Sequence, residues 1–144
     1  MIHSHTKIWI HIVWSVKNRE RVFFNEKVKG LFKFLIKKCD ELKVPSENIN
    51  IQPEHIHLLV NLPSNICLSD FVKNIKGSSS HWLNTENILK TKFSWQRGYG
   101  AFSVSSSQLD IVKNYIKNQS EHHKKKTFIQ EYEKWQKEYG LIDE

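Results

Sequence analysis

Two histidines separated by a single residue are the side chains in this sequence best placed to do chemistry. They lie in residues 54–60, Glu-His-Ile-His-Leu-Leu-Val, whose composition and alternation predict a β-strand. Successive side chains of a strand point to opposite faces, so Ile56 and Leu58 would enter a core. His55 and His57 would then lie side by side on the other face. Two imidazoles held in this way can bind one metal ion, and the competing interpretation is a half-buried strand with two polar residues facing water.

A tyrosine and a glutamine on a later helix can complete such a site. Apolar residues at helical spacing predict a helix at residues 108–124, which carries Tyr115 and Gln119. Residues four apart share a helical face, so these two side chains would point the same way. Because an amide oxygen and a neutral imidazole are both acceptable metal donors, Gln119 can join His55 and His57 around one divalent ion.

The chemistry that these residues can perform together is attack on a phosphodiester. A phenol has a pKa of about 10 and is a weak nucleophile at neutral pH, but a bound cation makes a phosphate a better electrophile by neutralising its non-bridging oxygens. Tyr115 would be the nucleophile, one helical turn from the metal. The sequence contains no Gly-x-x-x-x-Gly-Lys-[Ser/Thr] loop, so no nucleotide cofactor is expected. Transesterification to tyrosine conserves the bond energy for a later rejoining.

The composition is compatible with a nucleic-acid-binding protein of one domain. The chain has 144 residues, which we interpret as a single domain spanning residues 1–144. Its net charge of +7 and 12% aromatic content support binding to nucleic acid, although many basic proteins bind none. Cys39 and Cys67 have no Cys-x-x-Cys spacing, and no apolar run suits a membrane span or signal peptide. We therefore expect a cytoplasmic protein without a disulfide framework or a membrane partner.

The predicted strands and helices follow the order β-α-β-β-α-β and then two further helices. This order is typical of a split βαβ, ferredoxin-like sheet. We therefore predict an α+β fold: a ferredoxin-like βαββαβ antiparallel sheet with helices on one face plus C-terminal helices, and a functional open face. The elements are expected at residues 6–16, 26–44, 48–52, 54–60, 68–83, 93–105, 108–124 and from 128 onwards.

Several other side chains have both a structural and a functional interpretation. His11, in the central strand at residues 6–16, is interpreted as a histidine satisfied inside the sheet. Trp95 and Tyr99 can either stack on unpaired bases or pack in the core. Helix-capping side chains are expected at Asn25, Ser69, and Ser106 or Ser107.

Lysines and arginines supply candidate contacts to a phosphate backbone, because these residue types make most such contacts. A solvated turn explains the charged loop at residues 17–21 equally well, and close helix packing explains the small residues at 77–80. The complete set of candidate DNA contacts is Lys17, Arg19, Arg21, Lys73, Lys76, Arg97, His122 and His123.

Four stretches of the sequence together resemble one known family. They are residues 10–17 (IHIVWSVK), 53–60 (PEHIHLLV), 95–103 (WQRGYGAFS) and 115–119 (YIKNQ), the last leading to His122 and His123. In order and spacing they resemble the single-tyrosine HUH transposases, the small enzymes of hairpin-ended bacterial insertion sequences, to which the REP-associated tyrosine transposases are related. The likeness covers nearly the whole chain, and the combination is far more specific than His-x-His alone.

The resemblance implies a role for each matched residue. His55 and His57 match the histidine pair, Gln119 the third metal ligand, and Tyr115 the nucleophile that becomes linked to a DNA 5′ phosphate and leaves a free 3′ hydroxyl. The cofactor implied is Mg²⁺ or Mn²⁺, and the substrate is single-stranded DNA that carries a hairpin near the cleavage site. Such an enzyme cuts both ends of its element and rejoins them.

The resemblance also implies a homodimer with composite active sites. The histidine pair of one subunit would then work with the tyrosine helix of the other. An aromatic stripe follows Thr127 at helical spacing, and core packing or a subunit contact is its simplest interpretation. The stripe consists of Phe128, Tyr132, Trp135 and Tyr139.

Three other functions are compatible with parts of the sequence. A domesticated relative would use the same chemistry on chromosomal hairpin repeats. A non-catalytic ferredoxin-like nucleic-acid-binding module would leave Tyr115, Gln119 and the histidine pair unexplained. A histidine-triad nucleotide hydrolase would require a third alternating histidine where Leu59 stands.

Overall fold

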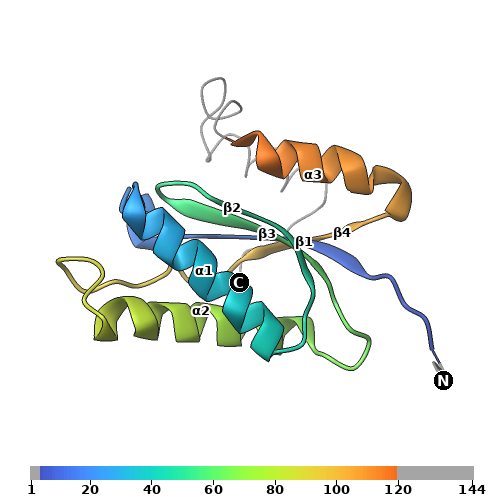
Figure 1. Cartoon of the computed structure of the whole chain (residues 1–144), viewed down its shortest axis with the longest axis horizontal. Helices are drawn as coiled ribbons and strands as arrows, with labels where there is room; N and C mark the ends of the chain where they lie inside the picture. The colour runs from blue at the N-terminus through green and yellow to red at the C-terminus, as the bar shows by residue number, and fades with distance from the viewer. Residues whose placement is uncertain (1–3, 120–144) are drawn as a thin grey trace.

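The computed structural model describes residues 4–119 of the chain and shows a four-stranded antiparallel sheet (Figure 1). The strand order is β2-β3-β1-β4, and each neighbouring pair is antiparallel. This order is compatible with the ferredoxin-like arrangement, and the predicted α+β class is confirmed. The elements are β1 (Trp9–Ser15), η1 (Lys17–Arg19), α1 (Glu26–Glu41), β2 (Ser46–Ile51), β3 (His55–Asn61), α2 (Leu68–Thr85), β4 (Gly100–Val104), η2 (Ser106–Gln108) and α3 (Leu109–Lys117).

The helices lie on both faces of the sheet. Figure 1 shows α1 and α2 together on one face and α3 across the other. Helix α3 contacts β2 and β3. The face that we expected to be open is therefore covered in part by the first of the predicted C-terminal helices.

The main core lies between the sheet and the pair α1 and α2. Ile12 and Trp14 of β1 and Ile56 and Leu58 of β3 are buried there, because alternate residues of each strand point to this face. From the helices, Leu31, Leu35, Phe71, Val72 and Ile75 fill the same layer. Burial of each large aliphatic side chain contributes about 1.5–3 kcal/mol, so this layer is the main source of stability.

Helices α1 and α2 meet at Gly30, Phe34 and Trp82. A Cβ atom at Gly30 would lie 3.4 Å from Cη2 of Trp82, at the short end of an ordinary van der Waals contact. The same indole stacks on Phe34, with ring centroids 4.9 Å apart. The Trp82 indole therefore lies between Gly30 and Phe34 of α1 and joins the two helices.

The segment before β4 is anchored to α2 by hydrogen bonds. Trp95 is buried, and its Nε1 donates to Ser79 Oγ at 2.9 Å. Lys76 Nζ donates to the main-chain oxygens of Gln96 and Gly98, each at 2.8 Å. Of the two interpretations of Trp95, core packing is the one that the structure bears out.

None of the expected capping side chains makes a capping hydrogen bond. Asn25 occupies the N-cap of α1 with φ of 54°, outside the extended backbone from which a side chain usually caps a helix. The N-cap of α2 is Cys67, and the Ser69 hydroxyl lies 3.1 Å from its sulfur instead. A 3-10 turn precedes α3, so Gln108 takes the N-cap position expected for Ser106 or Ser107.

Several expectations concern parts of the chain outside the described residues. These are the end of the helix predicted at 108–124, the final helix with its aromatic stripe Phe128, Tyr132, Trp135 and Tyr139, and the candidate DNA contacts His122 and His123. Within residues 4–119, no helix combines the length and apolar character needed to cross a bilayer.

Replacing Ser79 by alanine should destabilise the protein by about 1–3 kcal/mol, because the buried Trp95 N–H loses its acceptor. Urea denaturation followed by tryptophan fluorescence measures this change. Ser80→Ala is the matched control, since the Ser80 hydroxyl only donates to the Gly77 carbonyl at an exposed position. The control should stay within about 0.5 kcal/mol of the original protein. Equal effects of the two substitutions would contradict the structural role of Ser79.

Candidate active site

The pairing of β1 with β3 brings three histidines to one face of the sheet. Val13 lies opposite His57, and Ser15 lies opposite His55. Residues paired across an antiparallel ladder point to the same face, as do residues two apart on one strand. His11, two residues before Val13, therefore lies diagonally across from His57, on the face away from the main core.

A chain of side-chain contacts links these histidines to an acidic residue. His11 Nε2 lies 2.9 Å from His57 Nδ1, and His57 Nε2 lies 3.0 Å from His55 Nε2. His55 Nδ1 lies 2.9 Å from Glu54 Oε1. At the end of this chain, Arg21 Nη1 is 3.6 Å from the second carboxylate oxygen, Glu54 Oε2. The four groups from His11 to Glu54 thus form one continuous buried polar network.

Both histidines of the predicted pair are fully buried, with 0% relative exposure. The expectation that they occupy a solvent-exposed face is therefore wrong. The face is covered by α3, whose position above the sheet a strand pattern cannot reveal. Burial also lowers the pKa of His11 to about 3, because the charged imidazolium would lose its hydration, so this ring is neutral at neutral pH.

The two Nε2 atoms are placed as a pair of ligands to one ion would be. Two donors about 2.1 Å from an octahedral cation and at right angles to each other lie about 3 Å apart, close to the 3.0 Å between His55 and His57. Among the described residues, no three His, Cys, Asp or Glu side chains are grouped to hold a metal ion. The imidazole pair is nonetheless compatible in geometry with a divalent cation if a donor of another type joins it.

Helix α3 brings Tyr115 to this network within the same chain. The ring of Tyr115 meets His57 edge to face at a centroid distance of 6.1 Å, and His11 at 6.3 Å. The helix is tied to β2 by an ion pair between Lys113 and Glu47 and by a hydrogen bond from Asn48 Nδ2 to the Lys113 carbonyl at 3.1 Å. These two contacts lie within one turn of Tyr115, so they fix its position over the sheet.

Gln119 follows Tyr115 by one helical turn and is fully buried. Its Nε2 lies 3.5 Å from the Tyr115 carbonyl, which is at the limit of a hydrogen bond. Within residues 4–119, its Oε1 has no hydrogen-bond partner. A buried amide oxygen without a partner costs about 1–3 kcal/mol, so this oxygen is an available donor for a ligand.

The described basic residues expected to contact DNA are in different environments. Arg21 approaches Glu54, and the half-buried Lys76 donates to two carbonyls, with its pKa lowered by burial. Lys17 and Arg19 are exposed in η1, where Arg19 and the intervening Asn18 both have positive φ. The remaining candidate, Arg97, is exposed. It follows Gln96, whose side-chain oxygen accepts a hydrogen bond from the backbone N–H of Asn18.

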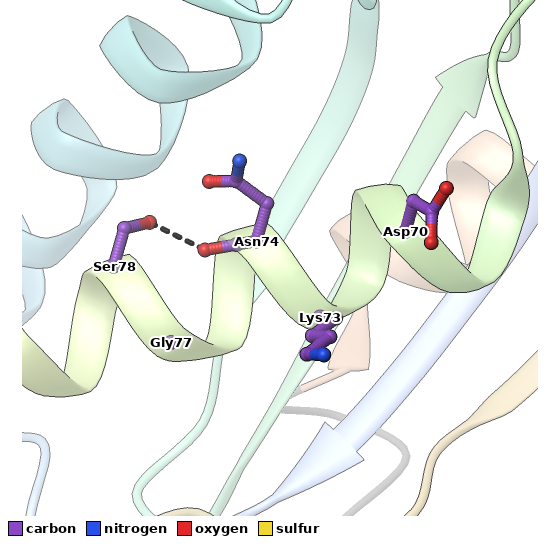
Figure 2. A pocket seen from close by; sticks show the side chains of 5 residues that line it. All are labelled: Asp70, Lys73, Asn74, Gly77 and Ser78. Atoms are coloured by element: carbon purple, nitrogen blue, oxygen red, sulfur yellow. Dashed lines mark hydrogen bonds between the residues drawn. The ribbon is translucent and has the colours of Figure 1, made fainter.

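Lys73 borders a shallow pocket that is separate from the histidine network. Figure 2 shows this pocket, whose lining residues all belong to α2. Ser78 Oγ donates to the Asn74 carbonyl there at 2.7 Å. The helix lies on the opposite side of the sheet from α3, so the pocket does not contribute to the site around Tyr115. The lining residues are Asp70, Lys73, Asn74, Gly77 and Ser78.

His11 is the residue whose contribution to the site sequence reasoning missed. It is buried and hydrogen-bonded inside the sheet, as interpreted, but its partner is the metal-ligand candidate His57. The predicted ferredoxin-like order already implies that the first and third strands, which carry His11 and His57, lie side by side. The face and register of both strands were also needed to pair the two rings.

The chain matches a model of one protein family over most of its length. The model is described as "Transposase IS200 like", and it matches residues 4–119. The chain therefore belongs to the IS200-like transposase family, a class of enzymes that cleave and transfer DNA. The resemblance inferred from the sequence motifs is confirmed.

Individual relatives agree with this assignment. The transposase for insertion sequence element IS200 from Salmonella typhimurium is 31% identical over 129 residues, covering 86% of this chain and 84% of the relative. The ISDra2 transposase TnpA from Deinococcus radiodurans is 28% identical over 114 residues, covering 76% of this chain and 81% of the relative.

Solved structures share the fold. A candidate transposase from Deinococcus radiodurans superposes with a TM-score of 0.68 at 25% identity, covering 83% of this chain and 95% of that chain. A REP-associated tyrosine transposase bound to a REP hairpin superposes with a TM-score of 0.64 at 18% identity, covering 85% of this chain and 73% of that chain.

Replacing Gln119 by leucine should leave stability without divalent cations unchanged or raise it by up to about 1–3 kcal/mol, because a buried oxygen without a partner is removed. Added Mn²⁺ should raise the melting temperature of the original protein but not of the variant. Thermal unfolding with and without Mn²⁺ measures both effects. Asn118→Leu, at the exposed neighbouring position, should retain the response to Mn²⁺. A clear loss of stability in the Gln119 variant without metal would argue against an available oxygen.

Proposed function

We propose that this transposase cuts and rejoins single-stranded DNA at hairpin-bearing element ends, with Tyr115 as the nucleophile. The observation that carries the proposal is the position of the Tyr115 ring, which lies against the ring of His57 in a buried network. The arrangement brings together Tyr115 and the imidazoles of His55 and His57, the residues that the sequence motifs identified as candidates. A non-catalytic DNA-binding module does not require this combination of groups.

In the proposed site His55, His57 and Gln119 would hold Mg²⁺ or Mn²⁺. The two converging Nε2 atoms and the unpartnered Gln119 Oε1 support this assignment. When bound, the cation would supply positive charge that stabilises the phosphate oxygens as the phosphorus is attacked.

The proposed reaction is a transesterification whose atoms balance. The Tyr115 oxygen attacks the phosphorus, the bond from phosphorus to the 3′ oxygen breaks, and a 5′-phosphotyrosine link forms. The phenol loses one proton and the departing 3′ oxygen gains one. Attack of a 3′ hydroxyl on the same phosphorus reverses the sequence of events and rejoins DNA, so no nucleotide hydrolysis is required.

Two observations support a hairpin-bearing single strand as the substrate. The chain has a net charge of +7, and Lys17, Arg19 and Arg97 are exposed. Such charges give affinity for phosphates that decreases as salt increases. A structural neighbour with the same fold is bound to a REP hairpin. A domesticated enzyme acting on chromosomal hairpin repeats would use the same chemistry, and inverted repeats flanking the gene would distinguish the two roles.

We further propose a homodimer with composite active sites, as the family resemblance implies. Tyr115 reaches the histidines of its own chain through α3, which is tied to β2 by the Lys113–Glu47 ion pair and by the hydrogen bond from Asn48 to the Lys113 carbonyl. Such a helix can be exchanged between subunits at low cost, because a swapped helix makes the same contacts with the partner.

Incubation with Mn²⁺ and a labelled hairpin strand should give a covalent protein–DNA adduct that survives denaturation. The label must lie on the 3′ side of the cut, because the tyrosine keeps the 5′ phosphate. Tyr115→Phe removes one oxygen and keeps the ring, so the adduct should disappear while hairpin binding persists. Denaturing gels and peptide mapping detect the link.

Tyr99→Phe is the matched control and should form the adduct normally, since Tyr99 packs against the main hydrophobic core. An adduct that persists in Tyr115→Phe, or that maps to another residue, would refute the assignment of the nucleophile. A DNA duplex of matched length should bind more weakly than the hairpin at moderate salt.

Mixing two inactive variants tests the composite site. His57→Ala and Tyr115→Phe chains are each expected to be inactive, and a mixed dimer would recover one intact site if the sites are shared. Because His57 is fully buried, the folding of His57→Ala must be verified first by circular dichroism. Sites built within one chain would give no recovery in the mixture, and a monomer by sedimentation would contradict the dimer.

A further inference from the structure

The ring of His57 contacts a histidine at each of its nitrogens. Nε2 faces His55 Nε2 at 3.0 Å, and Nδ1 faces His11 Nε2 at 2.9 Å. A neutral imidazole carries one ring hydrogen, so one nitrogen donates and the other accepts. The groups around His57 therefore decide which of its nitrogens presents a lone pair.

For His55, the position of the ring hydrogen is set by the Glu54 carboxylate. Glu54 Oε1 lies 2.9 Å from His55 Nδ1, and an ionised carboxylate can only accept. On this ground we assign the ring hydrogen of His55 to Nδ1, which leaves the lone pair of Nε2 directed toward His57. Metal-binding histidines commonly donate their second ring nitrogen to a carboxylate or carbonyl in this way.

We propose that His11 is a positioning residue for His57: His11 Nε2 accepts the hydrogen of His57 Nδ1 and thereby leaves the lone pair of His57 Nε2 directed at the cation site. This inference rests on the proposed function, because it takes His55 and His57 as ligands of one divalent cation. His11 would fix the tautomer of His57 in the same way that Glu54 fixes the tautomer of His55.

The proposal requires a coupled change of tautomer when a cation binds. Without a cation, the 3.0 Å contact between the two Nε2 atoms needs a donor. His55 already carries its hydrogen on Nδ1, so His57 must donate from Nε2 and accept at Nδ1 from His11. With a cation bound, His57 carries its hydrogen on Nδ1 and donates it to His11.

Hydrogens are conserved in this exchange. His57 releases the hydrogen on Nε2, His11 passes its Nε2 hydrogen to His57 Nδ1, and His11 takes up one hydrogen on its own Nδ1. Each ring keeps one hydrogen throughout, and the charge of the network does not change. The exchange is a relocation of hydrogens rather than a titration.

Packing holds the ring of His11 where the proposal needs it. The residue is buried, and its ring lies nearly parallel to that of His57, at 22° and with centroids 5.1 Å apart, as a hydrogen bond in the plane of the rings requires. The rings of Phe102 and Tyr115 lie at 5.9 Å and 6.3 Å. With aromatic neighbours on several sides, the ring has little freedom to turn away from His57.

Long-range ¹H–¹⁵N spectra of the full-length protein labelled at histidine test the tautomers directly. Upon addition of Mg²⁺, which is diamagnetic, the protonated nitrogen of both His57 and His11 should change from Nε2 to Nδ1, while that of His55 should stay Nδ1. The chain has eight histidines, so single substitutions assign the signals. Tautomers of His11 that do not change while Mg²⁺ binds would overturn the proposal.

Substitutions at position 11 test the consequence for affinity. His11→Phe keeps a ring and removes the acceptor, and it should weaken Mn²⁺ binding by about 10–100-fold in a titration of free Mn²⁺ by electron paramagnetic resonance. His11→Gln offers an amide oxygen as acceptor and should recover part of the affinity. Phe102→Leu alters a packing neighbour of His11 without removing the acceptor, and should change the affinity little.

The outcomes separate this inference from the proposed function. Mn²⁺ binding that is equally tight in folded His11→Phe and in the original protein would overturn the role of His11 and leave the ligand set intact. An original protein that binds no divalent cation would overturn both. Equal losses in His11→Phe, His11→Gln and Phe102→Leu would assign His11 a packing role only, which also refutes the proposal.

Discussion

The antiparallel register between β1 and β3 is the constraint on which the rest of the site depends. A shift of one residue would turn His11 toward the hydrophobic core and Ile12 toward the histidines, because side chains alternate at every position. The aliphatic residues that oppose each other on the core face make such a shift costly. The packing of Ile12 and Leu58 against α1 and α2 therefore fixes the geometry of polar groups on the other side of the same strands.

The polar network is stable only as a unit. Three imidazoles and a carboxylate are buried together, and each would lose hydration without a full set of partners. The contacts between neighbours offset this loss, and removal of one member leaves another without its partner. Helix α3 covers the network and places the Tyr115 ring against His57, so the same element shields the histidines from water and carries the proposed nucleophile.

Local patterns were sufficient for the parts of the site that lie within one element. Alternation in residues 54–60 placed His55 and His57 together, and helical spacing placed Tyr115 with Gln119. The contact of His11 with His57 joins residues 46 positions apart, so it required the register between two strands. The burial of the histidine pair likewise depends on where α3 packs, and Trp95 is buried among aromatic rings from distant parts of the chain and hydrogen-bonded to Ser79. Such features arise from tertiary packing and leave only a weak trace in sequence.

The donor types at the proposed site suit an anionic substrate. Two neutral imidazoles and a neutral amide would leave the charge of a divalent cation undiminished, whereas carboxylate ligands would cancel part of it before a phosphodiester arrived. The nearest acidic group, Glu54, acts through His55, and Arg21 opposes part of its charge at a distance of 3.6 Å. Because electrostatic interactions are stronger in a buried site than in water, this arrangement would direct the positive charge to the phosphate beside Tyr115. A set of neutral ligands binds a cation more weakly than a cluster of carboxylates. The affinity of such a site therefore depends more on how well a fixed partner orients each donor.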